Sequence, residues 1–386
     1  MSELASEPSA VSELASEPSA VSELASEPSG QRVLMEGSEA IAEAMVLAGC
    51  RFFAGYPMTP FTEVLEHMAK KLPPVGGVCM NAESELEAIG MAWGAAATGT
   101  PAATGSTGQG LSLMQESIAE ACLAGIPMLL INMARAQGDY FQATRGGGHG
   151  DYRTPVLAPQ DATEAVKLVK LGFQLTWRWR NPVLLFGDYY LAHTSSSVDT
   201  SAFDLGPLAP VDWGLDGSTG GTGRARLVSP LGTDKQRDDV GYDLAKHYYA
   251  CAARSAEMLA GIEPLAEVEG CDDADVVVVA FGTPARYVRA AVRELRADGV
   301  KAGSVRPITL LPFPTDAIAR AAEGAKVVAV YENNQGQMLD DVRLAVLGRA
   351  PVQFIGGLSL DTSGFGIAPD YDVAVFRQRI EKVLHD

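Results

Sequence analysis

The stretch "PAATGSTGQGLSLMQESIAEACLAG" (residues 101–125) decides the fold class. Its first residues are small and apolar, a glycine-rich turn follows, and the remainder reads as a helix that ends near Gly125. This order is typical of a strand, a tight turn and a helix. Such strand–turn–helix units build α/β proteins, in which the sheet is mostly parallel.

The same alternation extends on both sides of this stretch. Apolar strands alternate with helices, and polar or charged residues such as Arg135 follow directly after a strand. We therefore predict two α/β domains whose sites lie at the carboxyl ends of the strands. The predicted elements are a helix in 36–49, strands in 50–60 and 126–136, helix then strand in 161–188, strands in 274–283 and 300–314, a helix in 284–299, and strand, turn and helix in 325–348.

Changes in composition along the chain set the predicted domain bounds. Residues 1–32 contain three copies of a ten-residue unit, "SELASEPSAV" and its variant, which cannot bury a core, so we predict a disordered acidic tail. The first domain is predicted over 33–235, ending in a loop-like stretch from about 195. A linker helix over 236–265 and a second domain over 266–386 complete the chain.

Composition excludes several classes of protein. The 386 residues carry a net charge of −18, which argues against nucleic acid and anionic membranes as main partners. There is neither an apolar run long enough to span a membrane nor a signal peptide, so we expect a cytoplasmic protein. The five cysteines lie far apart without a CxxC pair. Neither a disulfide framework nor an iron–sulfur cluster held by this chain alone is expected.

Three glutamates cluster in "NAESELEAIGMAW" (81–93). If a helix begins near Ala82, Glu83 and Glu87 lie one turn apart on one face, whereas Glu85 faces small apolar residues. A carboxylate in such a dry pocket needs a specific partner and is a candidate acid, base or hydrogen-bond donor. Alternatively, all three glutamates complement the dipole at the helix N-terminus. The residues alone leave both interpretations open.

Three further stretches hold polar groups at predicted loops. "GYPMTPFTE" (55–63) presents Thr59 on a rigid, proline-flanked loop, and "TGSTGQGLS" (104–112) is a glycine turn that lacks the lysine of a P-loop. His149 lies in a glycine-rich loop among charged residues and could line a site for an anionic substrate. Each feature alone has a commoner explanation, namely a turn, a loop and a solvated histidine.

Taken together, these stretches resemble the α subunit of the 2-oxoacid:ferredoxin oxidoreductases, in particular the branched-chain 2-oxoacid type. The resemblance runs from about Val33 to the C-terminus. It implies a thiamine-diphosphate-enzyme pyrimidine-binding domain followed by a transketolase C-terminal-like α/β domain. The stretches that support it are "GYPMTPFTE", "AESELEAI", "STGQGLSLMQE", "MAR", "DYFQATRGGGHGDYR", "RPITLLPFP" and "ENNQGQMLDDVRLA".

The resemblance also implies roles for residues. Glu85 would be the catalytic glutamate that hydrogen-bonds the aminopyrimidine ring of thiamine diphosphate, and Arg135 would pair with the carboxylate of the 2-oxoacid. Thr59, Pro57 and His149 would line the substrate side. Residues near the cofactor would be Tyr56, Ser106, Thr107 and Gly108.

The resemblance further implies a partner. The chain lacks both the GDG motif with a downstream asparagine that holds Mg²⁺ and the cysteines of a cluster, so no metal site is expected on it. A β subunit would bring the diphosphate-binding domain, Mg²⁺ and at least one [4Fe–4S] cluster. Ferredoxin would accept the electrons, coenzyme A would accept the acyl group, and the assembly would be α2β2 or larger.

The implied function is oxidative decarboxylation of a 2-oxoacid to an acyl-CoA. Two alternatives stay open: half of a non-oxidative thiamine-diphosphate decarboxylase or transferase, and a non-catalytic interaction subunit. One departure concerns the substrate. Relatives often have a glycine-rich segment between the substrate arginine and "DYFQAT", whereas "ARAQGDYFQAT" runs on directly here. The sequence therefore does not identify the 2-oxoacid.

Overall fold

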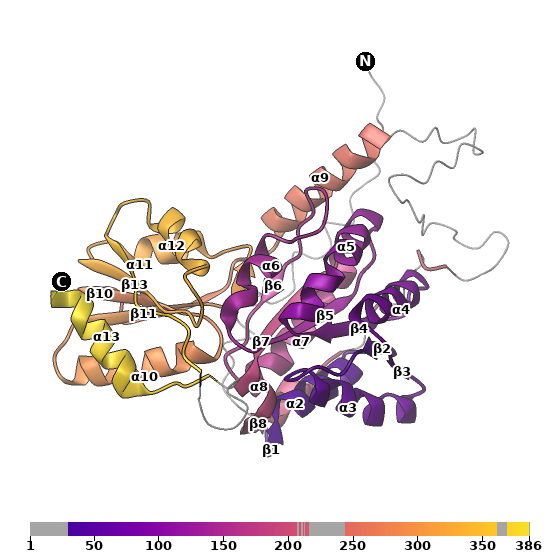
Figure 1. Ribbon diagram of the computed structural model, residues 1–386, viewed down its shortest axis with the longest axis horizontal. Helices are drawn as coiled ribbons and strands as arrows, with labels where there is room; N and C mark the ends of the chain where they lie inside the picture. Colours follow the sequence, from indigo (N-terminus) through magenta and orange to yellow (C-terminus); the bar gives the residue numbers. More distant parts are fainter. Residues whose placement is uncertain are drawn as a thin grey trace.

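The structure is a computed structural model that describes residues 30–385 except 207, 210, 212, 216–243 and 361–368. Most of the predicted tail and much of the loop-like stretch after 195 lie outside the described residues. Figure 1 shows two lobes side by side, with helix α9 (Leu244–Gly261) running along the first lobe. That helix falls within the predicted linker, while the domain bounds themselves stay a prediction.

The first lobe is built on a seven-stranded sheet. All neighbouring strands are parallel except the pair β12–β6, so the predicted parallel α/β arrangement is confirmed. The edge strand β12 comes from the C-terminal part of the chain and was not anticipated. In spatial order the strands are β12 (Thr309–Leu311), β6 (Val156–Leu157), β7 (Val183–Asp188), β5 (Leu129–Ala134), β4 (Ala102–Ser106), β2 (Phe52–Gly55) and β3 (Val78–Asn81).

Helices cover both faces of this sheet. On one face α2 (Gly37–Leu47), α3 (Thr62–Lys71) and α7 (Ala162–Trp179) bury a core against the strands, while α4 (Glu85–Ala97) and α5 (Gly108–Ala124) cover the other face. Successive strand residues point to opposite faces, so Ile131 belongs to the first core and Leu130 to the second. The short elements are η2 (Pro73–Val75), η3 (Gln137–Asp139), α6 (Tyr140–Thr144), α8 (Tyr189–His193) and η4 (Thr200–Phe203).

The interpretation of residues 195–199 as loop was wrong. Ser195–Asp199 forms strand β8, which pairs antiparallel with β1 (Arg32–Glu36). The serine-rich composition indicated a loop, but pairing with β1 satisfies the backbone. Asp199 then ends the strand by accepting hydrogen bonds from the backbone of Ser201 and Gly30.

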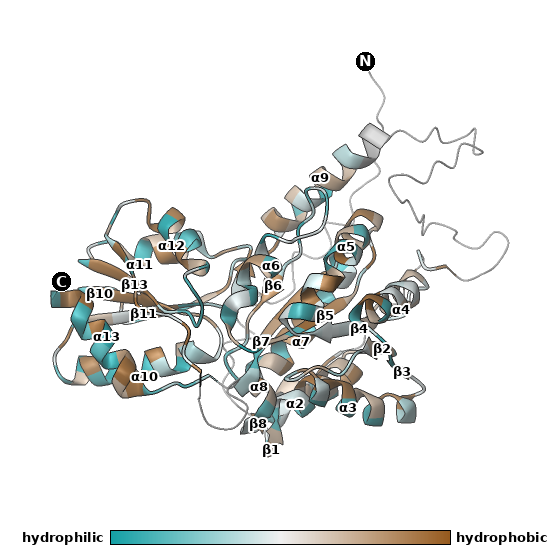
Figure 2. Cartoon of the chain, in the orientation of Figure 1, coloured by the Kyte–Doolittle hydropathy of each residue, from teal (hydrophilic) through white to brown (hydrophobic). Residues whose placement is uncertain are grey.

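The second lobe has a five-stranded sheet with the order β14 (Val352–Phe354), β13 (Val327–Val330), β10 (Val276–Val279), β11 (Ala302–Pro307) and β9 (Ala266–Glu269), of which only β9 is antiparallel to its neighbour. Its helices are α10 (Thr283–Ala297), α11 (Thr315–Ala321), α12 (Met338–Val346) and α13 (Val373–His385). Strands β10 and β13 are hydrophobic along their length, whereas α10 alternates between hydrophobic and hydrophilic residues (Figure 2).

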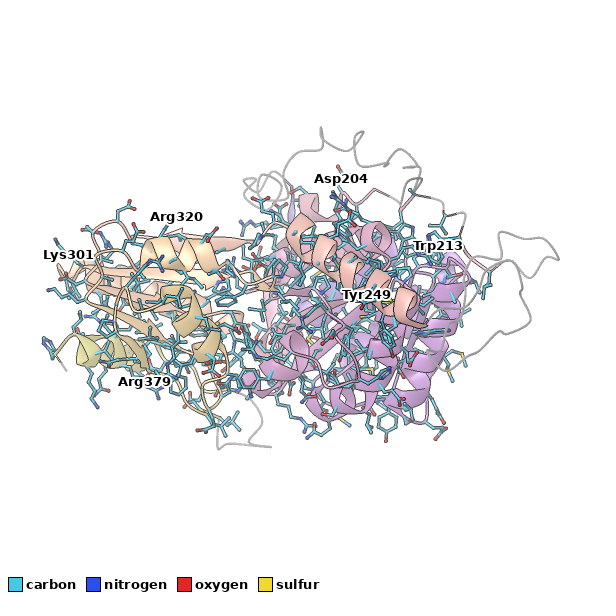
Figure 3. All side chains as sticks on the ribbon, turned by 90° about the horizontal axis from the view of Figure 1, so that it is seen from above. Asp204, Trp213, Tyr249, Lys301, Arg320 and Arg379 are labelled. Atoms are coloured by element: carbon cyan, nitrogen blue, oxygen red, sulfur yellow. The ribbon has the colours of Figure 1, made fainter. Side chains whose placement is uncertain are left out.

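The two lobes share one continuous core. The cluster that holds α4 and α5 against the first sheet also contains Phe281 of the second lobe, and the Tyr140 and Phe186 rings pack on it at centroid distances of 5.6 and 5.7 Å. Seen from above, Arg320 and Arg379 lie on one lobe and Tyr249 on the other (Figure 3). The lobes are therefore packed together rather than merely tethered.

Candidate active site

The predicted site residues other than His149 gather at the carboxyl ends of four neighbouring strands, β3, β2, β4 and β5. Thr59 follows β2, Glu85 follows β3 through the start of α4, Ser106 ends β4, and Arg135 follows β5. In a parallel sheet these ends lie along one edge, which is where α/β proteins place their sites.

Glu85 is buried, and its two neighbours in the cluster are exposed. Helix α4 begins at Glu85, three residues later than the sequence suggested, with Ser84 as its N-cap. Glu85 is 3% exposed. The carboxylate of Glu87 accepts a hydrogen bond from the Glu83 backbone nitrogen at 2.9 Å, and Ser84 Oγ accepts one from the Glu87 nitrogen at 3.3 Å. Capping is thus done by Ser84 and Glu87. The predicted burial of Glu85 is confirmed.

Glu85 has one protein partner among the described residues. Ser106 Oγ donates to Glu85 Oε1 at 2.8 Å. The surroundings are tight, since a Cβ on Gly110 would overlap both Ser106 Oγ and Glu85 Oε1. Glycine at this position of α5 is therefore required for the carboxylate to lie where it does, and the remaining acceptor positions of Glu85 are left for a ligand.

Arg135 lies at the same edge of the sheet as Glu85 and contacts the loop that carries Thr59. Its Nε donates to the Thr59 carbonyl oxygen at 3.1 Å, and its Nη1 lies 3.4 Å from Gln109 Oε1. Within the part of the chain that the structure describes, no carboxylate forms an ion pair with Arg135. A half-buried guanidinium bonded only to neutral oxygens is suited to binding an anion.

Three residues of this edge were missed by sequence reasoning, namely Gln109, Asn132 and Asp139. Asn132 Nδ2 donates to Asp139 Oδ2 at 3.1 Å, while the buried Asn132 Oδ1 has no partner. Burial raises the pKa of Asp139, although Asn132 and Arg135 act in the opposite direction. A lone asparagine within the apolar strand "LLINMA" was the signal available in the sequence.

The other predicted cofactor-binding residues lie at or near the start of helix α5. Ser106 and its neighbour Thr107 are buried, and Thr107 is the N-cap of α5. Gly108 follows, and a Cβ there would overlap Asp139 Oδ1. Tyr56 is half-buried and Pro57 exposed on the loop after β2.

His149 lies apart from this group. Its Nε2 is 3.3 Å from Glu120 Oε1 on α5. Glu120 is ten residues beyond Gly110, which corresponds to about 15 Å along a helix. The structure therefore brings Thr59, Glu85, Ser106, Thr107, Gly108 and Arg135 to one edge but does not bring His149 there.

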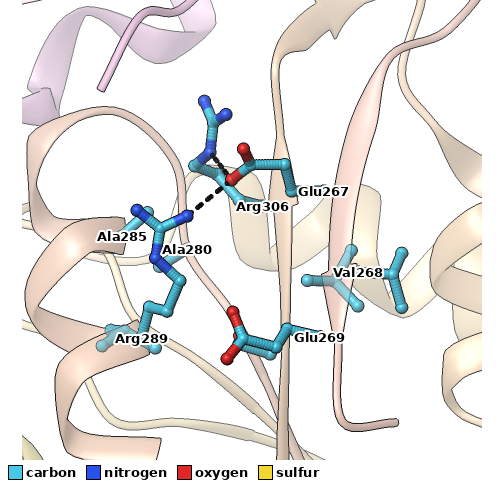
Figure 4. Close-up of a pocket in the computed structure, with 10 residues that line it drawn as sticks. Glu267, Val268, Glu269, Ala280, Ala285, Arg289 and Arg306 are labelled. Atoms are coloured by element: carbon cyan, nitrogen blue, oxygen red, sulfur yellow. Dashed lines mark hydrogen bonds and ion pairs between the residues drawn. The ribbon is translucent and has the colours of Figure 1, made fainter. Parts of the chain in front are cut away.

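A separate cavity of about 220 Å³ lies in the second lobe between β9, β11 and α10 (Figure 4). Arg289 Nη1 and Arg306 Nε both donate to Glu267 Oε2, at 3.0 and 2.9 Å. Because its charged groups neutralise one another, this cavity offers no free charge to a ligand.

The thiols of the described residues are not poised for chemistry. Burial raises the pKa of Cys50 and Cys122 to about 12, and that of Cys79 and Cys271 to about 11. A thiol rather than a thiolate is a poor metal ligand and nucleophile. Among the described residues, no group of three or more His, Cys, Asp or Glu side chains is arranged to hold a metal ion.

Comparison with known proteins gives a consistent result. Residues 43–208 match the family model "pyruvate flavodoxin/ferredoxin oxidoreductase, thiamine diphosphate-binding", and residues 274–363 match "pyruvate:ferredoxin oxidoreductase core domain II". The chain is 35% identical over 323 residues to the ketoisovalerate oxidoreductase subunit VorB of Methanothermobacter thermautotrophicus, covering 81% of this chain and 89% of the relative. It is 32% identical over 354 residues to the 2-oxoglutarate synthase subunit KorA of the same organism, covering 84% and 94%.

Solved structures agree. The 2-oxoglutarate:ferredoxin oxidoreductase from Magnetococcus marinus matches with a TM-score of 0.77 and 25% identity, over 92% of this chain and 66% of that chain. A split-gene transketolase matches with a TM-score of 0.56 and 16% identity, which shows a shared fold. The predicted fold class, a pyrimidine-binding domain followed by a transketolase-like α/β domain, is confirmed. No helix among the described residues has the length and apolar character needed to span a membrane.

Proposed function

The chain belongs to the 2-oxoacid:ferredoxin oxidoreductase family, and we propose that it is the α subunit of an enzyme that oxidatively decarboxylates a 2-oxoacid with thiamine diphosphate. The observation that carries this proposal is that an acidic and a basic side chain lie at the same edge of the sheet. Glu85 is buried and accepts one hydrogen bond, and Arg135 has no carboxylate partner among the described residues.

The residues at this edge fit thiamine diphosphate. Glu85 has acceptor positions without a protein partner among the described residues, Asn132 Oδ1 is buried without one, and the absence of a side chain at Gly110 makes room for the Glu85 carboxylate and Ser106 Oγ. Glu85 would hold the aminopyrimidine ring through a shared proton, with Ser106, Thr107 and Gly108 beside it. The chemistry that thiamine diphosphate supplies when bound is a carbon nucleophile and a sink for the electrons released by decarboxylation.

The remaining roles belong to side chains of this chain. Ser106 keeps the Glu85 carboxylate oriented, and the apolar residues around α4 keep water from it, so that Glu85 could hold a proton toward a bound aminopyrimidine ring. Arg135 orients the substrate by its carboxylate, and Thr59 on the neighbouring loop completes the substrate side, with Pro57 and Tyr56 near it. His149 is not assigned to the substrate.

A partner subunit completes the site in this proposal. The helices that flank Glu85 expose large apolar side chains: Leu86 is 52% exposed, Met91 37% and Leu113 55%. Such residues next to a site favour coverage by another protein. The partner would be a β subunit with the diphosphate-binding domain, Mg²⁺ and a [4Fe–4S] cluster that passes electrons to ferredoxin. Coenzyme A would take the acyl group in an α2β2 or larger cytoplasmic assembly.

For the substrate we favour a branched-chain 2-oxoacid. The relative named for ketoisovalerate is 35% identical over 81% of the chain. Within the described residues, Arg135 is the only cation hydrogen-bonded into the cluster, and its hydrogen-bond partners, the Thr59 carbonyl and Gln109, are neutral, while Asp139 lies close enough to interact with it electrostatically. One cation suits a monocarboxylic acid better than a dicarboxylic one.

The test is viologen reduction by this chain co-expressed with its β subunit, with thiamine diphosphate, Mg²⁺ and coenzyme A under exclusion of air. We expect activity with 3-methyl-2-oxobutanoate above that with 2-oxoglutarate. Glu85→Gln should lower kcat by about 10²–10⁴-fold, since it removes an acid–base group. The exposed neighbour gives the matched control, Glu83→Gln, which should act like wild type. Activity that survives Glu85→Gln would overturn the catalytic role, and activity without a cluster-bearing partner would favour the non-oxidative alternative.

A further inference from the structure

Gln137 is a buried residue of the first lobe whose polar groups are all used by the second lobe. It is 1% exposed and begins η3, two residues after Arg135. Its backbone nitrogen donates to the Asn333 carbonyl oxygen at 3.0 Å, and its Oε1 accepts from the Asn333 nitrogen at 2.8 Å. Its Nε2 donates to the Phe281 carbonyl oxygen at 2.9 Å, and its own carbonyl oxygen accepts from Asn334 Nδ2 at 2.8 Å.

The second-lobe end of this connection is itself fixed. Asn334 Nδ2 also donates to Glu332 Oε2 at 2.8 Å, and the Glu332 carboxylate accepts from the backbone nitrogens of Met338 and Leu339 at the start of α12. Asn333 is held by Ser359, whose nitrogen donates to Asn333 Oδ1 at 2.7 Å. Gln137 is therefore attached to a set of saturated polar groups rather than to a loose loop.

On the first-lobe side, only a short segment joins Gln137 to strand β5. Strand β5 ends at Ala134, so Arg135 and Ala136 are the whole connection between a core strand and the Gln137 anchor. Two residues held at both ends have little conformational freedom. The position of the Arg135 backbone, from which its guanidinium reaches Thr59 and Gln109, thus depends on where the second lobe holds Gln137.

We propose that Gln137 is the positioning residue of Arg135, so that the second domain sets the geometry with which the substrate carboxylate is bound. This inference rests on the proposed function, in which Arg135 binds that carboxylate. Gln137 itself would not touch the substrate, because its side chain is committed to Phe281 and Asn333.

The competing explanation is that Gln137 only docks the two lobes. The interface offers a matched residue for this comparison. Tyr140 is fully buried, and its hydroxyl donates to Asp341 Oδ2 of the second lobe at 2.6 Å, but it lies at the C-terminal end of η3, on the other side of Gln137 from Arg135. Loss of either contact should weaken docking, whereas only loss of the Gln137 contacts should release Arg135.

The experiment uses the co-expressed complex and compares Gln137→Met with Tyr140→Phe. Methionine has nearly the same size and removes both side-chain hydrogen bonds. We expect the KM for the 2-oxoacid to rise by about tenfold or more in Gln137→Met, with kcat changed by less than about threefold and the KM for coenzyme A unchanged, because a small displacement of a binding group acts on that ligand alone. Tyr140→Phe should leave all three constants near wild type. An unchanged 2-oxoacid KM in Gln137→Met, or an equal rise in Tyr140→Phe, would overturn the proposal.

A double-mutant cycle separates positioning from independent effects. If Gln137 acts through Arg135, the rise in KM for Gln137→Met combined with Arg135→Lys should be no larger than for Arg135→Lys alone. A double variant whose rise in KM equals the product of the two single-variant rises would contradict the proposal. Asn334→Ala places the change wholly in the second lobe and should raise the same KM, which keeps the test decisive if Gln137→Met folds poorly.

Failure of this inference and failure of the proposed function give different results. A wild-type complex that reduces viologen with a 2-oxoacid, while Gln137→Met and Asn334→Ala keep its KM, overturns the positioning role alone. A cluster-loaded wild-type complex without reduction by any 2-oxoacid overturns the proposed function, and the positioning role with it.

Discussion

Each lobe buries one glutamate near the start of a helix that follows a strand, and the two differ in how many hydrogen bonds they accept. Glu332 is fully buried and accepts from Asn334 Nδ2 at 2.8 Å and from the nitrogens of Met338 and Leu339 at 2.7 and 2.8 Å. Glu85 is 3% exposed and, among the described residues, accepts a hydrogen bond from Ser106 Oγ alone. Glu332 is thus satisfied by the fold, whereas Glu85 is not.

The difference teaches how to distinguish a structural carboxylate from a functional one when burial is the same. A buried carboxylate without enough hydrogen bonds costs several kcal/mol, so it persists only where a ligand or partner completes it. Glu332 holds together the turn that anchors Gln137, and three of its acceptor positions are filled by that turn. Glu85 keeps acceptors open at the edge where Arg135 also lies without a carboxylate partner among the described residues.

The contrast between Glu85 and Glu332 is tested most strongly by a substitution that displaces the Glu85 carboxylate. Gly110→Ala would put a methyl group where Ser106 Oγ and Glu85 Oε1 now lie, so one of them must move. We expect kcat for the 2-oxoacid to fall by about a hundredfold, since small displacements of catalytic groups have effects of this size. Steady-state viologen reduction by the complex measures it.

The control for this change is another glycine in a helix. Gly90 in α4 has no atom within 4 Å of an added Cβ, so Gly90→Ala should leave the fold intact and raise stability by up to about 1 kcal/mol through helix propensity. Thermal unfolding of both variants shows whether the loss in Gly110→Ala comes from the site. A Gly110→Ala protein with wild-type kcat would show that Glu85 need not lie where it does.

The second prediction concerns the stability of the protein rather than its activity. Glu332→Gln replaces an oxygen that accepts two backbone or amide protons with an NH₂ group, so at least one buried donor loses its partner. We expect the free energy of unfolding to fall by about 1–3 kcal/mol. Glu85→Gln, by contrast, loses at most one hydrogen bond and removes a buried charge, so its stability should stay near wild type or rise. Denaturant unfolding of the two variants measures the contrast.

The pH dependence provides a check with a definite sign. Burial raises the pKa of Glu332 above its ordinary value of 4.5, and the hydrogen bonds from Met338, Asn334 and Leu339 oppose that shift. A carboxyl with a raised pKa in the folded state contributes its stability below pH 4.5 and loses it as the pH rises through the folded pKa. The advantage of wild type over Glu332→Gln should therefore shrink from pH 4 towards neutrality. An advantage that grows with pH would mean that the hydrogen bonds outweigh burial.

Most of the fold, and the separation of Glu85 from its neighbouring glutamates, could be predicted from local sequence. Alternating strands and helices define the parallel sheets, and the spacing in "ESELE" separates Glu85 from Glu83 and Glu87, because both depend on residues near each other in the chain. The role of Gln137 could not be predicted, since its partners Asn333 and Phe281 lie more than 140 residues away.

The errors have the same origin. The pairing of β8 with β1 joins residues 195–199 to 32–36, and strand β12 joins the sheet of the other lobe, so neither is visible in local composition. The charged residues beside His149 and the resemblance predict that it lies on the substrate side. The structure places its Nε2 3.3 Å from Glu120 Oε1, far along α5, which local sequence does not show either.

The smallest expected effect tests whether a single hydrogen bond suffices to orient Glu85. Ser106→Ala removes the only hydrogen bond that Glu85 accepts among the described residues and leaves Gly110 and the helix unchanged. One such bond contributes about 0.5–1.5 kcal/mol, which corresponds to a two- to tenfold loss in kcat. Ser112→Ala, at an exposed serine one turn from Gly108 whose hydroxyl donates to the half-buried side chain of Gln142, is the matched control and should keep wild-type kcat. A loss beyond about a hundredfold in Ser106→Ala would mean that the serine takes part in proton transfer itself. No loss would mean that the bound ring, rather than the protein, orients the carboxylate, and the open acceptors of Glu85 would then be its main functional property.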